Sequence, residues 1–350
     1  MRLTTRLAAL LGVAGLCAAT VAAACTRATY LGPEGTVITA RSMDWSEDTL
    51  TDLWAFPRGL DRNGGTGERT LRWRSRYGSL VASAYDAGSA DGMNERGLVA
   101  NLLYLAESDF GEAVDGRPTL SVGAWPQYVL DNFATVAEAV EALRAEPFRI
   151  IGFALPNGRK ASLHLAISDA SGDSAVVEYL GGKLTINHGR DYQVMTNSPV
   201  FADQLALTRY WEEVGGMAML PGTIRAADRF VRASYYTHAV PQTADARQAV
   251  ASMLGVIRNV SVPYGITTPD KPNIASTLWR TVADQKTLTY YFDNALTPNV
   301  VWVRMAELNL AEGQPVRRAG LRELGDVAGS MAGRFQPAQP YEFRITFGPK

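Results

Sequence analysis

The sequence of 350 residues predicts an α+β fold, because of the way in which its expected strands and helices are distributed along the chain. Segments typical of strands cluster near both ends and in the middle of the chain, and segments typical of helices lie between them. Strands and helices therefore do not alternate one by one, as they would in a parallel α/β sheet. No change in composition marks a linker, and no internal repeat is present. We expect a single domain over residues 25–350, preceded by a leader at residues 1–24.

Strands are expected where apolar and polar residues alternate, or where β-branched apolar residues run together. The first two such segments, 27–31 and 36–42, are joined by Gly32-Pro33-Glu34-Gly35, a sequence typical of a turn. They predict a hairpin whose second strand ends close to residue 25. The expected strands are residues 27–31, 36–42, 79–85, 98–105, 162–168, 175–180, 184–187, 192–196, 287–293 and 299–305.

Helices are expected where alanine-rich segments with acidic residues repeat apolar side chains at helical spacing. Two loops between the strands are interpreted as turns. The glycine-rich segment 58–69 lacks the lysine of a phosphate-binding loop, and the carboxylates of 86–94 have the wrong spacing for a calcium loop. The expected helices are residues 121–131, 136–145, 202–212, 225–238 and 244–255.

The charge balance and the scarcity of cysteine and histidine exclude several classes of function. With 34 basic and 35 acidic side chains, the net charge is −1, which argues against a nucleic-acid-binding surface. Two cysteines are too few for a disulfide scaffold or a cysteine-based metal centre. The three histidines, His164, His188 and His238, are too few and too scattered for a histidine metal centre. We therefore expect no metal centre.

Residues 1–24 have the three zones of a secretory signal peptide. Arg2 and Arg6 precede an apolar stretch at residues 7–19, and Ala22-Ala23-Ala24 supplies the small residues of a cleavage site. The apolar stretch is short for a membrane span. Cleavage after Ala24 would make Cys25 the first residue of the mature protein.

A cysteine in that position has three interpretations. Its sulfur could carry the lipid of a bacterial lipoprotein, although Ala22 stands where lipoproteins usually have a large aliphatic residue. Its thiol could be a nucleophile that uses the α-amino group of the same residue as a base. It could also be a thiol with no role. The first 25 residues leave all three open.

A hydrolase built on Cys25 needs several further groups. The α-amine has an ordinary pKa of about 7.7–8.0 and the thiol one of about 8.5, so the amine can accept the thiol proton near neutral pH. A cation must favour the thiolate, an acceptor must hold the amine, and two donors must bind the developing oxyanion. Arg41 and Asp44, at the end of the predicted hairpin, are suitably placed to be the cation and the acceptor. A salt bridge at a strand end is the alternative.

Five blocks along the chain resemble the choloylglycine hydrolase family, which includes penicillin V acylases and bile-salt hydrolases. The resemblance runs in order through nearly the whole mature chain and favours the nucleophile over the lipid anchor. The blocks are Cys25 itself, Ala40-Arg41-Ser42-Met43-Asp44-Trp45, Asp91-Gly92-Met93-Asn94-Glu95-Arg96-Gly97-Leu98, Met195-Thr196-Asn197-Ser198-Pro199 and Asp228-Arg229-Phe230.

The resemblance implies a four-layer αββα sandwich of the N-terminal-nucleophile hydrolase type, with a role for each site residue. Cys25 would attack the amide carbonyl through a thioester intermediate, with its own α-amine as base. Arg41 would favour the thiolate and Asp44 would hold the amine. The oxyanion hole would come from the backbone N–H of Tyr104 and the side chain of Asn197. Arg229 would support this network; without the resemblance, Asn197 is interpreted as a turn cap and Arg229 as a helix-surface ion pair.

At two places this sequence differs from other members of the family in ways that concern the substrate. Tyr104 stands where many bile-salt hydrolases have asparagine and penicillin V acylases have tyrosine. The segment between Asn197 and Arg229 is shorter than in Gram-positive members. Both features resemble the Gram-negative branch, which implies a small amide substrate, namely penicillin V or long-chain N-acyl homoserine lactones. Trp45 is expected either to line the pocket or to belong to the core. Bile-salt hydrolysis, and a lipid-anchored binding protein without enzyme activity, are the alternatives.

The signal peptide, the charge balance and the resemblance together indicate how the mature protein exists in the cell. We expect a periplasmic enzyme that uses no metal or organic cofactor and has no stable membrane anchor and no nucleic-acid partner. The resemblance also implies a homo-oligomer, a tetramer in the family.

Overall fold

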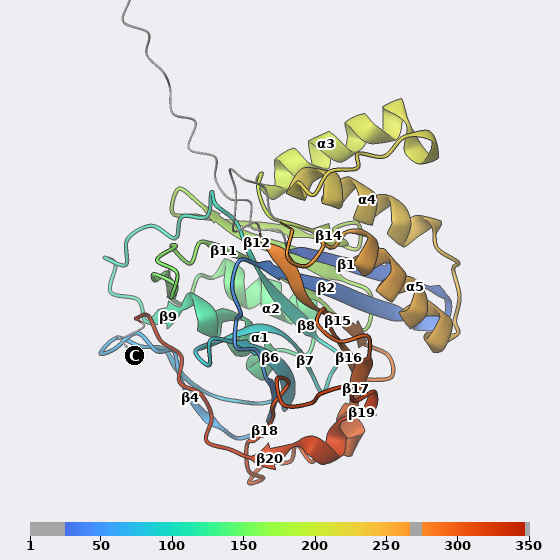
Figure 1. Cartoon of the computed structure of the whole chain (residues 1–350). Helices are drawn as coiled ribbons and strands as arrows, with labels where there is room; N and C mark the ends of the chain where they lie inside the picture. The colour runs from blue at the N-terminus through green and yellow to red at the C-terminus, as the bar shows by residue number, and fades with distance from the viewer. Residues whose placement is uncertain (1–24, 267–274, 347–350) are drawn as a thin grey trace, which may run out of the picture.

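The computed structural model describes residues 25–266 and 275–346, and two large sheets packed face to face form its centre (Figure 1). The predicted signal peptide at residues 1–24 lies outside the described residues. The first sheet has seven strands, in the order β14 (Val194–Met195), β1 (Thr26–Leu31), β2 (Val37–Trp45), β15 (Ser276–Asp284), β16 (Thr289–Asn294), β17 (Val300–Arg304) and β19 (Gly329–Ser330). Neighbouring strands are antiparallel except β17 and β19.

The second sheet has nine antiparallel strands and faces the first. Two short strand pairs, β4 (Asp61–Asn63) with β5 (Arg72–Arg74) and β9 (Thr119–Ser121) with β10 (Arg149–Ile151), lie outside it. The strands of the large sheet, in order, are β13 (Lys183–His188), β12 (Ser174–Leu180), β11 (Leu163–Ser168), β8 (Val99–Tyr104), β7 (Gly88–Asn94), β6 (Ser79–Ala84), β3 (Leu53–Phe56), β18 (Arg317–Ala319) and β20 (Gln336–Pro337).

Helices cover the outer faces of both sheets. On the first sheet, α4 (Ala226–Ala239) and α5 (Ala246–Asn259) pack against β1 and β2, and α3 (Phe201–Val214) lies against α4 and projects past the sheet (Figure 1). On the second, α1 (Trp125–Asn132) packs on β7 and β8, and α2 (Val136–Arg144) on β12 and β13. The order helix, sheet, sheet, helix confirms the predicted αββα sandwich.

Local sequence explains where several helices begin. The Thr135 side chain accepts a hydrogen bond from the Glu138 N–H, and the Glu138 carboxylate accepts one from the Ala134 N–H, which closes a capping box at the start of α2. Asp245 caps α5 by accepting from the N–H groups of Arg247 and Gln248. Each predicted helix is present, with its ends displaced by a few residues at most.

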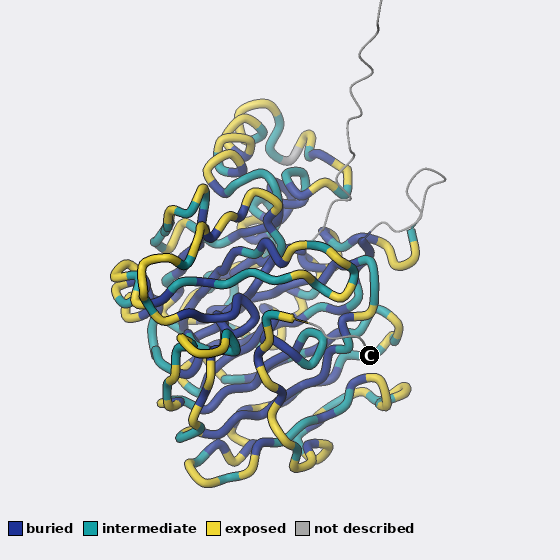
Figure 2. Tube along the Cα trace, turned by 90° about the vertical axis from the view of Figure 1, so that its left-hand side faces the viewer, coloured by how far each residue is buried: buried dark blue, intermediate teal, exposed yellow. Residues whose placement is uncertain are grey.

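The buried residues lie mainly between the layers of the sandwich. Figure 2 shows buried residues along the strands of the central layers and exposed residues on loops and outer helix faces. One large apolar cluster joins the inner faces of the sheets to α4 and α5, and a second lies under α1 and α2. Within the described ranges, no helix has both the length and the apolar character needed to cross a bilayer.

Each predicted strand is present, but the prediction of a polar turn over residues 86–94 is wrong. Residues Gly88–Asn94 form β7, a central strand buried at all seven positions. Its composition is unusual because the space around it is narrow. A Cβ atom on Gly92 would lie only 2.8 Å from the Leu80 carbonyl oxygen, and one on Gly88 only 3.0 Å from the Gly123 Cα. Small residues are needed at these points, so the usual apolar pattern of a strand is missing.

Candidate active site

The β1–β2 hairpin places Cys25 beside the end of β2, as predicted. The two strands pair in register from Leu31 with Val37 to Thr26 with Ser42, and residues 33–35 form the turn. The Cys25 side chain is 2% exposed, and its Sγ lies 3.7 Å from the Asp44 carbonyl oxygen. The hairpin therefore brings the first residue of the domain next to the acidic residue nineteen positions later.

Arg229 of α4 reaches into the hairpin and contacts several predicted site residues. Its Nη1 donates to the Cys25 carbonyl oxygen at 2.7 Å and also to the Thr26 hydroxyl. Its Nη2 donates to Asn197 Oδ1 at 3.0 Å, and its Nε to the Ile224 carbonyl at 3.0 Å. Arg229 is fully buried, so it is not the helix-surface residue that local sequence alone would suggest. One guanidinium thus connects α4, β1 and the residues that follow β14.

The hydrogen bond from Arg229 fixes the orientation of the Asn197 side chain. A guanidinium has only donors, so the Asn197 atom that faces it must be the amide oxygen. The Asn197 NH2 group therefore points the other way, where it donates to the Tyr104 carbonyl oxygen at 2.6 Å. Tyr104 is the last residue of β8. The structure thus places Asn197 at the end of β8, as the implied oxyanion hole requires.

The residues around Asn197 hold its backbone in place. The Gln204 Nε2 of α3 donates to the Asn197 carbonyl and to the Pro199 carbonyl, and its Oε1 accepts from the Thr196 hydroxyl at 3.0 Å. The Ser198–Pro199 peptide bond is cis. On the other side, His164 Nε2 lies 2.8 Å from the Thr196 carbonyl oxygen. The segment is therefore tied from two directions.

Asp44 is a fully buried carboxylate at the end of β2. The Thr277 hydroxyl of β15 donates to its Oδ1 at 2.5 Å, and the Ser42 hydroxyl to its Oδ2 at 3.3 Å. The Arg229 Nη1 lies 3.8 Å from the same Oδ2. Burial raises the pKa of Asp44 to about 6, although the charge of Arg229 and the hydrogen bond from Thr277 act to lower it.

Arg41 is also buried, but it makes fewer hydrogen bonds than Arg229. Its Nη2 donates to the Leu102 carbonyl at 3.1 Å, and its guanidinium lies 4.4 Å from the centre of the Trp279 ring. Within the described part of the chain, its Nε and Nη1 have no hydrogen-bond partner. Burial raises the pKa of the Cys25 thiol, and the charge of Arg41 is the strongest influence that lowers it. Arg41 therefore acts in favour of the thiolate but does not outweigh burial.

A small, mainly apolar cavity of about 80 Å³ opens beside Cys25. Trp45 lines it, where the pocket interpretation of this residue requires it to be. The Trp45 ring lies 5.8 Å from the Tyr104 ring. The other apolar walls come from both sheets and from the loop before β11: Met43, Leu102, Tyr104, Phe153, Leu155 and Leu163. A larger groove of about 830 Å³ between α3 and α4 contains none of the predicted site residues.

The described residues contain no cluster of three histidine, cysteine or acidic side chains that could hold a metal ion. His164 instead pairs with Glu178 at 3.0 Å, and His188 with Asp173 at 2.7 Å.

Sequence reasoning missed Thr277 and assigned no role to Asp91. Thr277 lies on β15, a strand that no periodic pattern indicates. Asp91 lies on β7 and is buried against three donors: the Tyr290 hydroxyl at 2.5 Å, the Asn101 amide at 2.6 Å and the Thr281 hydroxyl at 3.2 Å. The charge of Arg41 acts to lower the pKa of Asp91, against burial, which raises it. A carboxylate inside a segment of small residues is the signal that could have indicated a buried partner for an arginine.

The fold and the cluster around Cys25 define a class of enzyme. Residues 25–318 match the family described as linear amide C–N hydrolases of the choloylglycine hydrolase family, and this chain belongs to that family. The resemblance inferred from the five sequence blocks is therefore confirmed, as is the prediction of a hydrolase that acts on linear amide C–N bonds.

Comparison with individual proteins shows which members of the family this chain resembles. The chain is 48% identical to a penicillin V acylase of Pectobacterium atrosepticum, over 98% of each chain. A solved structure of a penicillin V acylase from Agrobacterium tumefaciens is 53% identical, with a TM-score of 0.85 over 91% of this chain and 99% of that one. A mutant conjugated bile acid hydrolase from Clostridium perfringens has a TM-score of 0.72 over 84% of this chain and 96% of that one. Its identity is 22%, so this likeness concerns the fold alone.

Proposed function

We propose that this protein is an N-terminal cysteine amidohydrolase that cleaves the side-chain amide of penicillin V through a thioester acyl-enzyme. The observation that carries the proposal is the single buried cluster of Cys25, Asp44, Asn197 and Arg229 at the edge of an apolar cavity. The family match begins at Cys25, and two relatives at about half identity are named penicillin V acylases.

The proposed reaction begins once removal of residues 1–24 frees the α-amine of Cys25. Burial raises the pKa of the Cys25 thiol, so in this scheme the thiol gives its proton to the amine as the sulfur attacks the amide carbonyl. The carbon–sulfur bond forms, and the carbonyl electrons move to the oxygen. The Asn197 amide and the Tyr104 N–H would bind this oxyanion, with the Asn197 donor turning from the Tyr104 carbonyl to the substrate.

The second half of the reaction releases the two products in turn. The ammonium of Cys25 returns its proton to the amide nitrogen, the carbon–nitrogen bond breaks, and the amine product leaves. Water then attacks the thioester carbonyl and gives its proton to the α-amine. The carbon–sulfur bond breaks, the ammonium returns the proton to the sulfur, and the acid product leaves. In this scheme Asp44 holds the amine in place, Arg41 stabilises negative charge on the sulfur, and Arg229 holds Asn197 and the Cys25 backbone.

The cavity supports a small, apolar acyl group. Its walls are mostly aromatic and aliphatic, and Trp45 and Tyr104 offer ring faces to an aromatic ring such as phenoxyacetyl. A flexible chain also suits an apolar lining, so long-chain N-acyl homoserine lactones are the second proposed substrates. A volume of about 80 Å³ is small for a steroid, which places conjugated bile salts third.

The cellular context is part of the same proposal. The signal-like leader supports export to the periplasm, with a soluble mature enzyme that starts at Cys25 and assembles into a homo-oligomer. The intact mass of the mature protein tests the N-terminus: a chain beginning at unmodified Cys25 supports the proposal, and an added diacylglyceryl group would support the lipid-anchored alternative. Sedimentation of the mature protein tests the assembly.

The decisive experiment compares three forms on three substrates. The mature enzyme should hydrolyse penicillin V faster than a long-chain N-acyl homoserine lactone or glycocholate. Cys25→Ala should fold but show no turnover. A form with one extra residue before Cys25 should also be inactive, because its amine is a peptide nitrogen that accepts no proton. Full activity of the extended form would contradict the mechanism, and a preference for glycocholate would contradict the substrate.

A further inference from the structure

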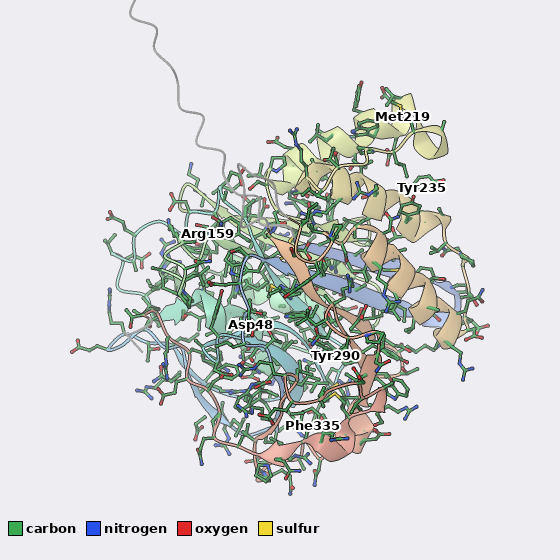
Figure 3. The ribbon with its side chains drawn as sticks, in the orientation of Figure 1. Asp48, Arg159, Met219, Tyr235, Tyr290 and Phe335 are labelled. Carbon is green, nitrogen blue, oxygen red and sulfur yellow. The ribbon has the colours of Figure 1, made fainter. Side chains whose placement is uncertain are left out.

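The loop before β11 forms part of the cavity wall and carries a cation on its outer side. Phe153 and Leu155 line the cavity. The Leu155 N–H donates to the Arg159 carbonyl at 2.7 Å, and Ala154 and Lys160 form an isolated antiparallel bridge, so this segment is a fixed hairpin. Figure 3 labels Arg159 beside the start of β11. Its guanidinium lies 5.3 Å from the centre of the Trp45 ring.

The charge of Arg159 is not neutralised by the described residues. Arg159 is half-buried, and its guanidinium makes no ion pair or side-chain hydrogen bond within them. The acidic side chains bonded to neighbouring parts of the site have other partners. Glu47 accepts from the Tyr85 hydroxyl at 2.6 Å, and Glu107 from the Ser198 hydroxyl at 2.7 Å. The five donors of Arg159 therefore remain available to an anion from outside the protein.

The position of Arg159 decides which part of a substrate it meets. Trp45 lines the cavity that contains Cys25, and Arg159 lies on the Trp45 ring but does not line the cavity. When an apolar acyl group occupies the cavity, the amine half of the amide must extend toward the opening. A charge on the amine half then stays in contact with water, and the half-buried Arg159 is a cation that lies against one wall of the cavity, the Trp45 ring.

We propose that Arg159 is a specificity-determining residue that binds a carboxylate on the amine half of the substrate. This inference rests on the proposed amidohydrolase function. A guanidinium matches the geometry of a carboxylate, and the Trp45 ring restricts its orientation through the cation–π contact. For a given acyl group, the enzyme accordingly favours amides whose leaving amine carries a carboxylate, such as the penam acid of penicillin V or a glycine conjugate, over amides of uncharged homoserine lactone.

The test uses penicillin V and its methyl ester, which share an acyl group and a scissile bond and differ by one charge. Arg159→Gln should raise KM for penicillin V by about threefold to tenfold, the scale of one partly exposed charge-assisted contact. The same variant should leave KM for the methyl ester and kcat for both compounds nearly unchanged. Arg159→Lys should recover part of the loss, because it keeps the charge but not the fork.

Lys160→Gln is the matched control. It removes one positive charge from the same hairpin, but Lys160 is exposed and does not lie on Trp45, so KM for penicillin V should stay close to that of the wild type. High salt should weaken the binding of penicillin V but not of its ester in the wild-type enzyme, and should have a smaller effect in Arg159→Gln.

The outcomes separate the two proposals. Hydrolysis of both compounds by the wild type, with equal losses in Arg159→Gln, would overturn the role of Arg159 and leave the amidohydrolase intact. The same KM increase in Lys160→Gln would also overturn it, since a general field would then explain the effect. Hydrolysis of neither compound by the wild type would overturn the proposed function and this inference together.

Discussion

Two fully buried arginines flank Cys25, and they differ in how they are bonded. Every nitrogen of Arg229 donates to an oxygen of the protein, whereas two nitrogens of Arg41 have no partner among the described residues. They also act on different neighbours. Arg41 lowers the pKa of Cys25 more than Arg229 does, and Arg229 lowers the pKa of Asp44 more than Arg41 does. In the proposed mechanism, Arg229 therefore holds the geometry of the site, and Arg41 stabilises negative charge on the sulfur.

The difference in hydrogen bonding between the two arginines affects the free energy of burying them. A buried cation without hydrogen bonds is unfavourable unless a nearby opposite charge compensates it. The charge of Arg41 acts to lower the pKa of two buried carboxyl groups, Asp91 and Asp44, and Asp91 is fixed in β7 by its own bonds to Tyr290, Asn101 and Thr281. Tyr290 is labelled in Figure 3. Two nitrogens of Arg41 thus have no hydrogen-bond partner among the described residues, and in the proposed mechanism they are the donors that stabilise negative charge during the reaction.

The largest effect is expected from breaking the well-bonded arginine. Arg229→Gln removes contacts to Cys25, Thr26 and Asn197 and leaves Asp44 buried without its main counter-charge. We expect the free energy of unfolding to fall by about 3–5 kcal/mol, together with loss of activity. Chemical denaturation and turnover of penicillin V measure the two effects. A variant as stable as the wild type would show that the contacts of Arg229 are not structural.

Arg41→Gln should separate activity from stability. Turnover should fall by about a hundredfold, the scale of losing one group that stabilises reacting charge. The free energy of unfolding should change by less than about 2 kcal/mol, because few hydrogen bonds of Arg41 are lost and Asp91 keeps its three hydrogen-bond donors. The same two measurements apply, and a loss of stability as large as that of Arg229→Gln would refute the separation.

Lysine at each position tests the two roles directly. Arg41→Lys keeps the charge that this position needs and should recover much of the activity. Arg229→Lys keeps the charge but lacks the planar guanidinium that reaches four oxygens, so it should remain inactive. Equal rescue at both positions, in kcat and in thermal unfolding, would contradict the division of roles.

The two arginines also differ in how far the sequence predicts them. The αββα layers, the hairpin and the set of site residues follow from strand and helix periodicity together with the five family blocks. Arg41 and Asp44 were expected beside Cys25 because a tight turn returns β2 to the start of β1, and the register confirms this. Arg229 was reached only through the resemblance, since locally it follows Asp228 in a helix and looks like a surface residue.

Strands β15 and β7 were not predicted from the sequence, and the reason is the same for both. Strand β15 reads Ser-Thr-Leu-Trp-Arg-Thr-Val-Ala-Asp, and its polar residues Thr277 and Thr281 meet buried partners in the interior. β7 is made of small residues because of close backbone approach. Polarity patterns detect strands that bury apolar side chains, and both of these strands instead bury the polar groups of the site. The least strand-like sequences therefore supply Thr277 and Asp91.

The smallest expected effect concerns Thr277, whose hydroxyl shares Asp44 with Arg229. In the proposed mechanism Asp44 must be ionised to hold the amine, so protonation of Asp44 near its pKa of about 6 adds to the loss of activity that protonation of the α-amine causes as the pH falls. The ammonium of mature Cys25 would move the pKa of Asp44 lower. Because the Thr277 hydrogen bond lowers the pKa of Asp44, Thr277→Val should move the acid limit of kcat/KM to higher pH and leave the alkaline rate almost unchanged.

The contribution of Asp44 to the free energy of unfolding should decrease with rising pH, whereas activity increases. The pH dependence of unfolding is therefore a second measurement that tests this prediction. A carboxyl group whose pKa is raised by folding binds its proton more tightly in the folded state, so its contribution to stability falls as the pH rises from about 3.8 to about 6. Relative to Asp44→Asn, the wild type should therefore lose stability over the range in which it gains activity. Thr277→Ser keeps the hydroxyl and should match the wild type in both curves. An acid limit that moves to lower pH in Thr277→Val would show that Thr277 does not stabilise the ionised form of Asp44.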